Sequence, residues 1–317
     1  MQYLIGVDGG GTKTNIVAAD KDSLELFFTK AHSSSWREQG IDFVVSNIKQ
    51  SIYSQLIRAD DTIVGMSLGL PYFGESPENE KPIISKFQAA FPGVPIYFSN
   101  DVEVGWAGSL GLKAGINVVS GTGSIAFGKN ESGKSARCGG WSEFFGDEGS
   151  CYWIGKRVME LFSKQSDGRM EIDPLYEIVR SEFSLNDDFD FIDLMYKDYI
   201  GQRDKVASLQ LLAQKAALNG SLSAIALYEE VIAELCLLVK ALRDRLDFEK
   251  EKFNVSYSGG LFNVGELIIP EFSKRVQAIG GKLTGPEFGP AEGALLLSFS
   301  KFYPEGLPQI YEKLKNL

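Results

Sequence analysis

One strand–glycine turn–strand pattern occurs twice in this chain, once at the N-terminus and once after residue 115. The first copy spans residues 4–19, with the glycine turn Asp8–Lys13 between two apolar stretches. The second spans residues 116–128, with the turn Ser120–Ser124 in the corresponding place. Each turn leads into another strand and not into a helix, which excludes a P-loop or a dinucleotide-binding unit. The repeat predicts two domains that fold alike.

Size and charge agree with two domains and limit the partners. A chain of 317 residues is long enough for two hydrophobic cores, and 44% hydrophobic residues is typical of a packed protein. The formal net charge of -10 repels nucleic-acid phosphates and anionic lipids, so neither nucleic acid nor a membrane is an expected partner. An anionic ligand would have to be held locally, by backbone amides and a metal ion.

The cysteines and the N-terminus indicate a cytoplasmic protein. Cys138, Cys151 and Cys236 are odd in number and lack the paired spacing of a zinc site or a redox dithiol. Met1 leads directly into an apolar strand without a signal-peptide pattern, and no stretch approaches the roughly 20 apolar residues of a membrane span.

Hydrophobic periodicity predicts the elements around the two turns. In the first half it predicts a third strand at 24–29, a helix from Asp42 to Leu56, a strand at 63–68, a helix at 83–91 and a strand at 96–98. In the second half it predicts helices at 147–162, 221–246, 291–302 and 308–317, and a strand at 253–257. We therefore expect a first domain at 1–115, which a C-terminal helix at 303–317 could complete. The second domain is expected at 116–302, with a helical insertion at about 165–220.

The glycine turns are suited to binding phosphate. Glycine permits backbone conformations in which several N–H groups converge on one anion, and Thr12 and Lys13 add a hydroxyl and an ammonium group. Either turn alone could be a hairpin with a flexible tip. Two turns at equivalent positions favour binding of one phosphate chain. Asp8 would then hold Mg²⁺ through water, because Mg²⁺ keeps several waters beside carboxylate and phosphate oxygens.

Asp101 ends a predicted strand and opens a helical stretch. A carboxylate at the carboxyl end of a parallel strand points into the region where open α/β sheets bind ligands. From there it could accept the proton of an alcohol during phosphoryl transfer. The alternative is that Asp101 caps the helix.

Two short motifs give the chain a family resemblance. Cys138-Gly139-Gly140-Trp141 precedes Gly146-Asp147-Glu148-Gly149-Ser150, in order with the DGGGTKT, ND, SGTGS and SGG segments. Over its whole length the chain resembles the N-acetylglucosamine kinases of the BadF/BadG/BcrA/BcrD ATPase group, within the actin, Hsp70 and sugar-kinase superfamily. The resemblance implies an α/β fold of two RNase-H-like (actin-like ATPase) domains. Each would be a mixed five-stranded sheet flanked by helices, with an active-site cleft between the two.

The resemblance also implies a reaction. This reaction is ATP-dependent phosphorylation of the C6 hydroxyl of an N-acetylated amino sugar, with N-acetylglucosamine as the first candidate. It would require Mg²⁺. The resemblance also allows a homodimer. Amino sugar metabolism and cell-wall recycling would be the context. The family commonly has Asn before an aromatic where this chain has Ser33-Ser34-Ser35-Trp36. The shorter Ser34 or Ser35 would leave room for N-acetylmuramate.

By position, the resemblance assigns roles to individual residues. Asp101 would be the base and Asp8 the magnesium ligand. The phosphates would be bound by Gly9, Gly10, Gly11, Thr12, Lys13, Gly121, Thr122 and Gly123, and the adenosine by Gly259 and Gly260. The sugar would contact Ser34, Ser35, Asp101, Thr122, Cys138, Gly140, Trp141, Asp147 and Cys151. Alternatively, Asp147 caps a helix, Trp141 is a core residue and the two cysteines fill small buried volumes.

Three other functions remain open at this stage. A glucosamine or glucose kinase would share the ATP-binding segments and differ around the C2 substituent of the sugar. An ATPase activator of a 2-hydroxyacyl dehydratase would need cysteines that ligate an iron–sulfur cluster. A nucleotide-gated regulatory module would have lost the base, which this chain retains as Asp101.

Overall fold

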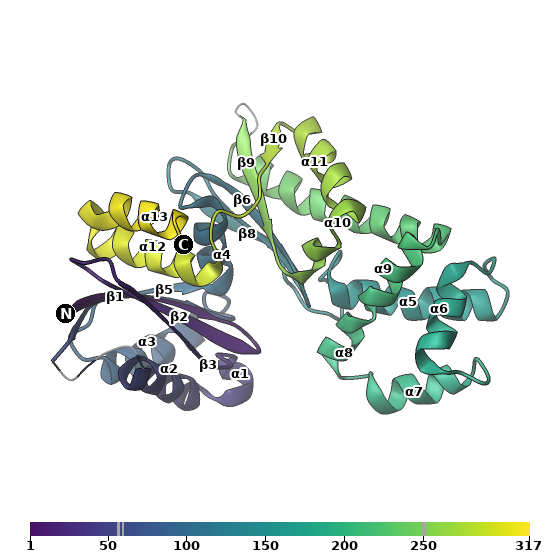
Figure 1. Ribbon diagram of the computed structural model, residues 1–317, viewed down its shortest axis with the longest axis horizontal. Coiled ribbons are helices and arrows are strands. Elements are labelled where there is room, and N and C mark those ends of the chain that lie inside the picture. Colours follow the sequence, from purple (N-terminus) through teal and green to yellow (C-terminus); the bar gives the residue numbers. More distant parts are fainter. Residues whose placement is uncertain (56–57, 59, 249–251) are drawn as a thin grey trace. The chain divides into compact units, whose positions relative to one another are not determined.

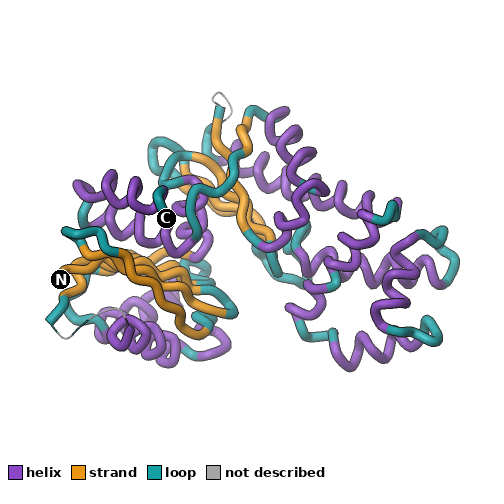
Figure 2. Tube along the Cα trace, in the orientation of Figure 1, coloured by secondary structure: helices purple, strands orange, loops and turns teal. Residues whose placement is uncertain are grey.

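The structure is a computed structural model that describes residues 1–55, 58, 60–248 and 252–317. The chain divides into two compact units, residues 1–114 with 285–317 and residues 115–284. Each unit contains one five-stranded sheet, drawn in orange in Figure 2. The two units are described separately below.

The first sheet has the strand order β3-β2-β1-β4-β5. Its strands are β1 (Gln2–Gly9), β2 (Lys13–Asp20), β3 (Leu26–His32), β4 (Thr62–Leu70) and β5 (Ile96–Asn100). The three strands of the N-terminal meander are antiparallel, whereas β4 pairs with both β1 and β5 in parallel. This mixed sheet brings the carboxyl ends of β1, β4 and β5 to one edge.

Helices cover both faces of the first sheet. They are α1 (Trp36–Gln39), α2 (Ile41–Gln55), α3 (Pro77–Ala90), α4 (Asp101–Leu110), α12 (Pro290–Phe302), the 3-10 turn η2 (Pro304–Gly306) and α13 (Leu307–Lys315). Figure 1 shows α2 and α3 on one face and α12 and α13 on the other. Successive residues of β1 alternate between these faces, because Leu4 lies in the cluster with α12 and Ile5 in the cluster with α2 and α3.

The C-terminal boundary of the second domain differs from the expectation. We expected residues up to 302 to belong to the second domain, but α12 packs in the first unit. Leu295 and Phe299 share a buried cluster with Leu4 of β1. The backbones also approach closely, since a Cβ on Gly6 would lie 2.2 Å from the amide nitrogen of Leu295. Only glycine permits this contact between β1 and α12.

Two other predicted elements of the first unit have different limits. The third strand begins at Leu26 and not at Leu24, because the Asp20 carboxylate accepts hydrogen bonds from the backbone of Asp22 and Ser23 and fixes a turn there. Helix α2 is described to Gln55, and the predicted end at Leu56 lies outside the described residues.

The second sheet repeats the topology of the first, as the duplicated pattern predicts. Its order is β10-β9-β6-β7-β8. The strands are β6 (Gly115–Ser120), β7 (Ser124–Lys129), β8 (Ser135–Gly139), β9 (Phe253–Ser258) and β10 (Gly281–Leu283). Strands β6, β7 and β8 form the antiparallel meander, and β9 pairs with β6 and β10 in parallel. The predicted fold of two related mixed sheets is confirmed.

The helices of the second unit include a helical segment that has no equivalent in the first. They are α5 (Cys151–Ser166), α6 (Pro174–Phe183), α7 (Asp190–Asp198), α8 (Arg203–Ser208), α9 (Gln210–Leu218), α10 (Leu222–Arg245), the 3-10 turn η1 (Gly260–Leu267) and α11 (Ile269–Ala278). Helices α6 to α9 occupy the region expected to be an insertion. The long helix expected at 221–246 is α10, and Ser221 caps it by accepting a hydrogen bond from the amide of Ala224.

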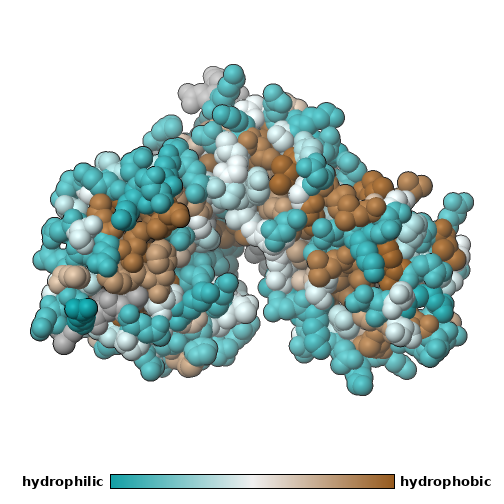
Figure 3. All heavy atoms as spheres, in the orientation of Figure 1, coloured by the Kyte–Doolittle hydropathy of each residue, from teal (hydrophilic) through white to brown (hydrophobic). Residues whose placement is uncertain are grey.

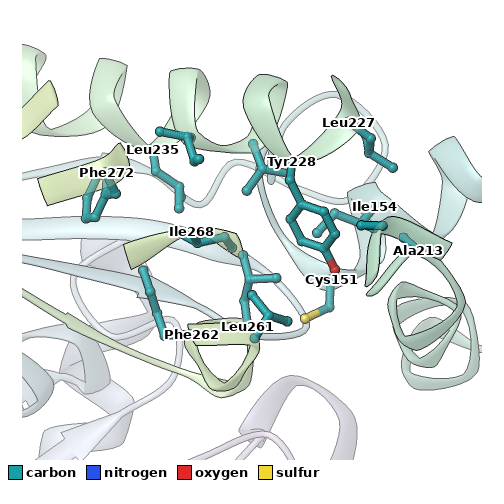
Figure 4. Packing of buried hydrophobic residues seen from close by; sticks show 14 of the residues in the cluster. Cys151, Ile154, Ala213, Leu227, Tyr228, Leu235, Leu261, Phe262, Ile268 and Phe272 are labelled. Carbon is teal, nitrogen blue, oxygen red and sulfur yellow. The ribbon is translucent and has the colours of Figure 1, made fainter. Parts of the chain in front are cut away.

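One extended core joins these helices to the second sheet. Figure 4 shows Tyr228 and Leu235 of α10 packed with Leu261 and Phe262 of η1. Cys151, the first residue of α5, belongs to the same cluster. The start of α5 is thereby tied to the core beneath the second glycine turn.

The surface neither identifies nor excludes a partner. No helix in the described part of the chain is long and apolar enough to cross a membrane. Figure 3 shows apolar side chains at the surface of the helical part of the second unit. Exposed large apolar residues there include Phe189, Ile192, Tyr196, Leu211 and Leu218. The homodimer stays a prediction.

Candidate active site

The first unit brings Asp8 and Asp101 to the same edge of its sheet. Asp8 pairs with Gly69 near the end of β1, and Asn100 at the end of β5 pairs with Leu70 of the strand between them. Asp101 follows as the first residue of α4. Gly69 allows α4 to pack closely, because a Cβ there would lie 2.6 Å from a methyl group of Val104. The two carboxylates thus lie where parallel strands of α/β sheets present ligand-binding groups.

Asn100, and not Asp101, caps α4. The Asn100 side chain accepts a hydrogen bond of 3.1 Å from the amide of Val102, and its own amide donates to the carbonyl of Phe73 at 2.8 Å. Asn100 is therefore the N-cap of α4, a role that the sequence also allowed for Asp101. The Asp101 carboxylate is therefore available for another function.

Both carboxyl groups have raised pKa values. Burial, assisted by the negative charge of Asp8, raises the pKa of Asp101 to about 7. Burial raises the pKa of Asp8 to about 6, opposed by a hydrogen bond from Asn15 and assisted by the charge of Glu292. A buried carboxylate near a second one favours the protonated form, so each becomes a stronger base than an exposed carboxylate.

The first glycine turn is held from behind by the segment before α1. The Gly10 amide donates to the Lys13 carbonyl at 2.9 Å, and the Gly10 carbonyl accepts from the Ser34 amide at 3.0 Å. The Ser33 hydroxyl donates to the Gly11 carbonyl at 2.7 Å. A Cβ on Gly11 would meet no atom within 4 Å, so the space beside this residue is open. The outer side of the turn can therefore accept a ligand.

Ser34 and Ser35, the expected sugar contacts of the first unit, are packed in its interior. Both are fully buried, and the Ser34 hydroxyl bonds to Thr14 at 2.5 Å. A Cβ on Gly9 would lie 2.9 Å from that of Ser34, so Ser34 packs against the back of the glycine turn. Contact of these serines with a sugar, and the room that they would leave for N-acetylmuramate, stay predictions.

In the second unit, the two segments expected to bind ATP lie together. Strands β6 and β9 pair in parallel up to Val119 and Ser258, which places the following turns side by side. Gly259 has a φ of +100°, and a Cβ there would lie 2.2 Å from the Ser120 carbonyl oxygen. A Cβ on Gly121 would lie 3.8 Å from the Gly260 nitrogen. This juxtaposition could place an adenosine and its phosphates on neighbouring backbone.

The second glycine turn is anchored to the start of α5. The Gly121 amide donates to the Gly123 carbonyl at 2.9 Å, and the Gly121 carbonyl accepts from the Cys151 amide at 2.8 Å. Ser150 caps α5 by accepting a hydrogen bond from the Trp153 amide, so the helix begins at Cys151 and not at Asp147. The capping alternative for Asp147 is therefore wrong.

Asp147 instead lies beside the second turn with an unusual backbone. Its φ is +57°, which is rare for a residue other than glycine, and the residue is only 3% exposed. Its carboxylate accepts hydrogen bonds from the Ser124 amide at 3.4 Å and from Arg203 at 2.5 Å. Thr122 donates to Asp204 at 3.3 Å. Arg203 and Asp204 were not predicted, because nothing in their local sequence marks them.

The remaining expected sugar-binding residues divide into exposed and buried ones. Trp141 is 75% exposed, so the alternative that it is a core residue is wrong. Cys138 and Gly140 lie partly buried at the end of β8 and just after it. Cys151 is buried in the core cluster shown in Figure 4, and burial raises the pKa of its thiol to about 11. The structure therefore favours a packing role for Cys151.

A cavity of about 610 Å³ lies in the first unit, next to Asp8. Its lining residues come from β2, β3, the end of α2 and the start of α12: Asn15, Ile16, Phe28, Thr29, Lys30, Gln55, Gly289, Pro290, Ala291 and Glu292. None of them is an expected ligand-binding residue. Asn15 donates to Asp8 at 3.2 Å, so the cavity adjoins the Asp8 side of the site without containing it.

The groups present fit a metal bound by one carboxylate. Among the described residues, no three His, Cys, Asp or Glu side chains are grouped to hold an ion. Asp8 is a buried carboxylate with a raised pKa, which a nearby cation would stabilise in its charged form. One carboxylate with waters and phosphate oxygens is a common magnesium environment.

The duplicated mixed sheets define the chain as an actin-like ATPase fold of the kind found in sugar kinases. The chain belongs to the BadF/BadG/BcrA/BcrD ATPase family, whose model matches residues 5–298.

Three proteins show the similarity in detail. The N-acetylmuramic acid/N-acetylglucosamine kinase of Clostridium acetobutylicum is 30% identical over 279 residues, 86% of this chain and 90% of that protein. The N-acetyl-D-glucosamine kinase of Dictyostelium discoideum is 29% identical over 315 residues, 94% of this chain and 98% of that protein. A crystal structure from Chromobacterium violaceum, provisionally described as an N-acetylglucosamine kinase, has a TM-score of 0.73 at 27% identity, covering 94% of this chain and 99% of that one.

Proposed function

We propose that this protein transfers the γ-phosphoryl group of ATP to the C6 hydroxyl of N-acetylglucosamine, with Asp101 as the general base. The observation that carries this proposal is the Asp101 carboxylate, which stands at the carboxyl end of β5, is relieved of capping by Asn100 and has a pKa near 7. A base with this pKa holds an alcohol in line and accepts its proton as the phosphoryl group leaves ATP.

The other residues take supporting roles in the proposal. Asp8 would hold Mg²⁺, which supplies charge neutralisation for the transferring phosphoryl group when bound. Gly9 to Lys13 and Gly121 to Gly123 would bind phosphate, and Gly259 with Gly260 the adenosine. Asp147 would accept hydrogen bonds from sugar hydroxyls, with Trp141 beside the sugar.

N-acetylmuramate is proposed as a second acceptor because the Clostridium acetobutylicum relative bears that name. Ser34 and Ser35, both buried behind the first glycine turn, remain the residues proposed to leave room for its larger C3 substituent. We also propose a place in cell-wall recycling, because two relatives are named as kinases of N-acetylated amino sugars. The cytoplasmic location stays a prediction from the sequence.

The iron–sulfur alternative is disfavoured by where the cysteines lie. A cluster between two subunits needs accessible cysteine ligands, but Cys151 lies in the core of the second unit. Cys138 and Cys236 are partly buried.

The substrate is tested by a panel of acceptors with Mg-ATP: N-acetylglucosamine, N-acetylmuramate, glucosamine, glucose and 6-deoxy-N-acetylglucosamine. We expect the highest kcat/KM with N-acetylglucosamine and at least ~10-fold less with glucose, because one missing substituent contact changes discrimination by about that factor. The 6-deoxy sugar should accept no phosphate, and phosphorus NMR of the product should show a 6-phosphate. ATP consumption that is independent of every sugar would contradict the proposal.

The pH dependence tests the base. Protonation of Asp101 removes the proton acceptor, so kcat/KM for the sugar should fall towards low pH. The pKa of Asp101 is about 7 without metal, and Mg²⁺ bound by Asp8 would lower the pH at which the fall begins. The measurement is log(kcat/KM) between pH 5 and 9, and a profile that is flat over this whole range would contradict Asp101 as the base.

A further inference from the structure

Helix α8 contacts the second glycine turn at two places. Arg203, its first residue, lies against Gly123, because a Cβ on Gly123 would be 2.7 Å from Nη2 of Arg203 and 2.8 Å from Oδ2 of Asp147. Asp204, the next residue, accepts the hydroxyl of Thr122 at 3.3 Å. A segment absent from the first unit therefore adds two charged side chains to the expected phosphate and sugar residues.

The position of α8 is fixed by backbone packing on α5. A Cβ on Gly155 would lie 1.9 Å from the carbonyl oxygen of Val206, so the two helices approach with no side chain between them. Val206 and Ala207 are buried, and Leu209 continues into the core. The same α5 begins at Cys151, whose amide bonds to Gly121. Helix α5 therefore fixes the positions of both Arg203 and the second glycine turn.

The Asp147 carboxylate depends on Arg203 for its charge. Its side chain is only 4% exposed, and the charged groups that face it are Arg203 of α8, at 2.5 Å, and Glu143 of the preceding loop. Burial raises the pKa of Asp147 and Glu143 raises it further, whereas Arg203 and the Ser124 amide oppose this. Arg203 also approaches Glu143 at 3.8 Å. A single guanidinium therefore compensates two carboxylates.

We propose that Arg203 is a positioning residue for the acceptor sugar, holding the Asp147 carboxylate charged and immobile against the Gly121–Gly123 turn. This inference rests on the proposed function, in which Asp147 accepts hydrogen bonds from sugar hydroxyls. An ionised carboxylate offers only acceptor lone pairs, whereas a protonated one presents an O–H and loses acceptor capacity. The ion pair occupies Oδ2 on one side and leaves further lone pairs of the carboxylate for hydroxyl groups.

The role predicts a selective loss of sugar affinity. In Arg203→Met, the KM for N-acetylglucosamine should rise by about 10-fold or more, because a buried carboxylate loses its charged donor. The KM for ATP should change by less than ~3-fold, since the backbone turn remains. Arg203→Lys should recover part of the sugar affinity, because the charge is restored without the guanidinium fork.

The matched control is Arg275→Met. Arg275 has similar side-chain exposure, 33% against 41% for Arg203, and it also pairs with carboxylates, Glu271 and Glu229. It lies on α11 and contacts no expected ligand-binding residue. Arg275→Met should have the kinetic constants of the wild type.

Two measurements separate positioning from a purely structural role. Raising the pH should restore sugar affinity in Arg203→Met, because deprotonation of Asp147 replaces what the arginine supplied. In an Asp147→Asn background, Arg203→Met should have no further effect on the sugar KM, as coupled residues show in a double-mutant cycle. A carbon-NMR titration of the Asp147 carboxyl should show a higher pKa in Arg203→Met, whether or not sugar is turned over.

The outcomes are distinguishable. A wild-type protein with no sugar-dependent activity contradicts the proposed function itself. An active wild type whose Arg203→Met variant keeps its sugar KM, or loses sugar and ATP affinity equally at every pH, overturns the role of Arg203. An unchanged Asp147 titration in Arg203→Met would overturn it as well.

Discussion

Asp101→Asn is expected to lower kcat by at least ~100-fold, in keeping with removal of a positioned general base. The amide has nearly the same shape as the carboxylate, so binding of ATP should persist and the loss should appear in kcat and kcat/KM alike. The control is Asp42→Asn, which removes a first-turn carboxylate from α2 in the same unit. That variant should remain fully active. A similar small effect in both would mean that the Asp101 charge serves only its helix.

The same substitution should not destabilise the protein at pH 8. The pKa of Asp101 is raised on folding from 3.8 to about 7, so the folded state holds its proton more tightly and loses stability as the pH rises through this range. Asn carries no charge and avoids that loss. Thermal unfolding should therefore give Asp101→Asn a Tm at or above that of the wild type at pH 8. The advantage should disappear near pH 4, and a lower Tm at pH 8 would contradict the raised pKa.

Gly259→Ala is expected to raise the KM for ATP by roughly 10- to 100-fold. The new Cβ would meet the Ser120 carbonyl at 2.2 Å, so β9 and the second glycine turn must separate. Overpacking of this kind costs about 1–3 kcal/mol, and each 1.4 kcal/mol is tenfold in affinity.

Gly280→Ala is the matched control for this variant. Gly280 also has a positive φ, +89°, but a Cβ there meets no atom within 4 Å. The Gly280→Ala variant therefore has the backbone strain but no close contact of the new Cβ. Its KM for ATP should equal that of the wild type. Equal KM values in both variants would show that the juxtaposition of Ser120 and Gly259 does not matter for nucleotide.

The duplicated architecture could be predicted because its signals are local. Glycine turns between apolar strands, and the Ser221 start of α10, depend on residues adjacent in sequence. Strands β8 and β10 were not predicted, since they are short and partly exposed edge strands. The assignment of α12 to the first unit was missed because it depends on close backbone contact at Gly6 and not on the helix itself.

For the candidate site, the sequence identified several candidate residues but not the contacts that those residues make in the folded chain. The sequence identified Asp101 as the candidate base. It could not show that Asn100 caps α4, because Asn and Asp are both good capping residues. It assigned Ser34 and Ser35 to the sugar site, but it could not show that both are buried behind the first glycine turn, because that depends on the path of a loop. Arg203 was not predicted as a site residue, because its ion pair with Asp147 joins residues 56 positions apart and depends on how α8 packs on α5.

A crystal structure with N-acetylglucosamine, Mg²⁺ and a non-hydrolysable ATP analogue tests the central claim most directly. It should show the C6 hydroxyl oxygen of the sugar within hydrogen-bond distance, about 2.6–3.2 Å, of the Asp101 carboxylate. It should also show the adenosine against Gly259 and Gly260. A sugar bound with its C6 hydroxyl away from Asp101, or a nucleotide that contacts neither glycine turn, would contradict the account.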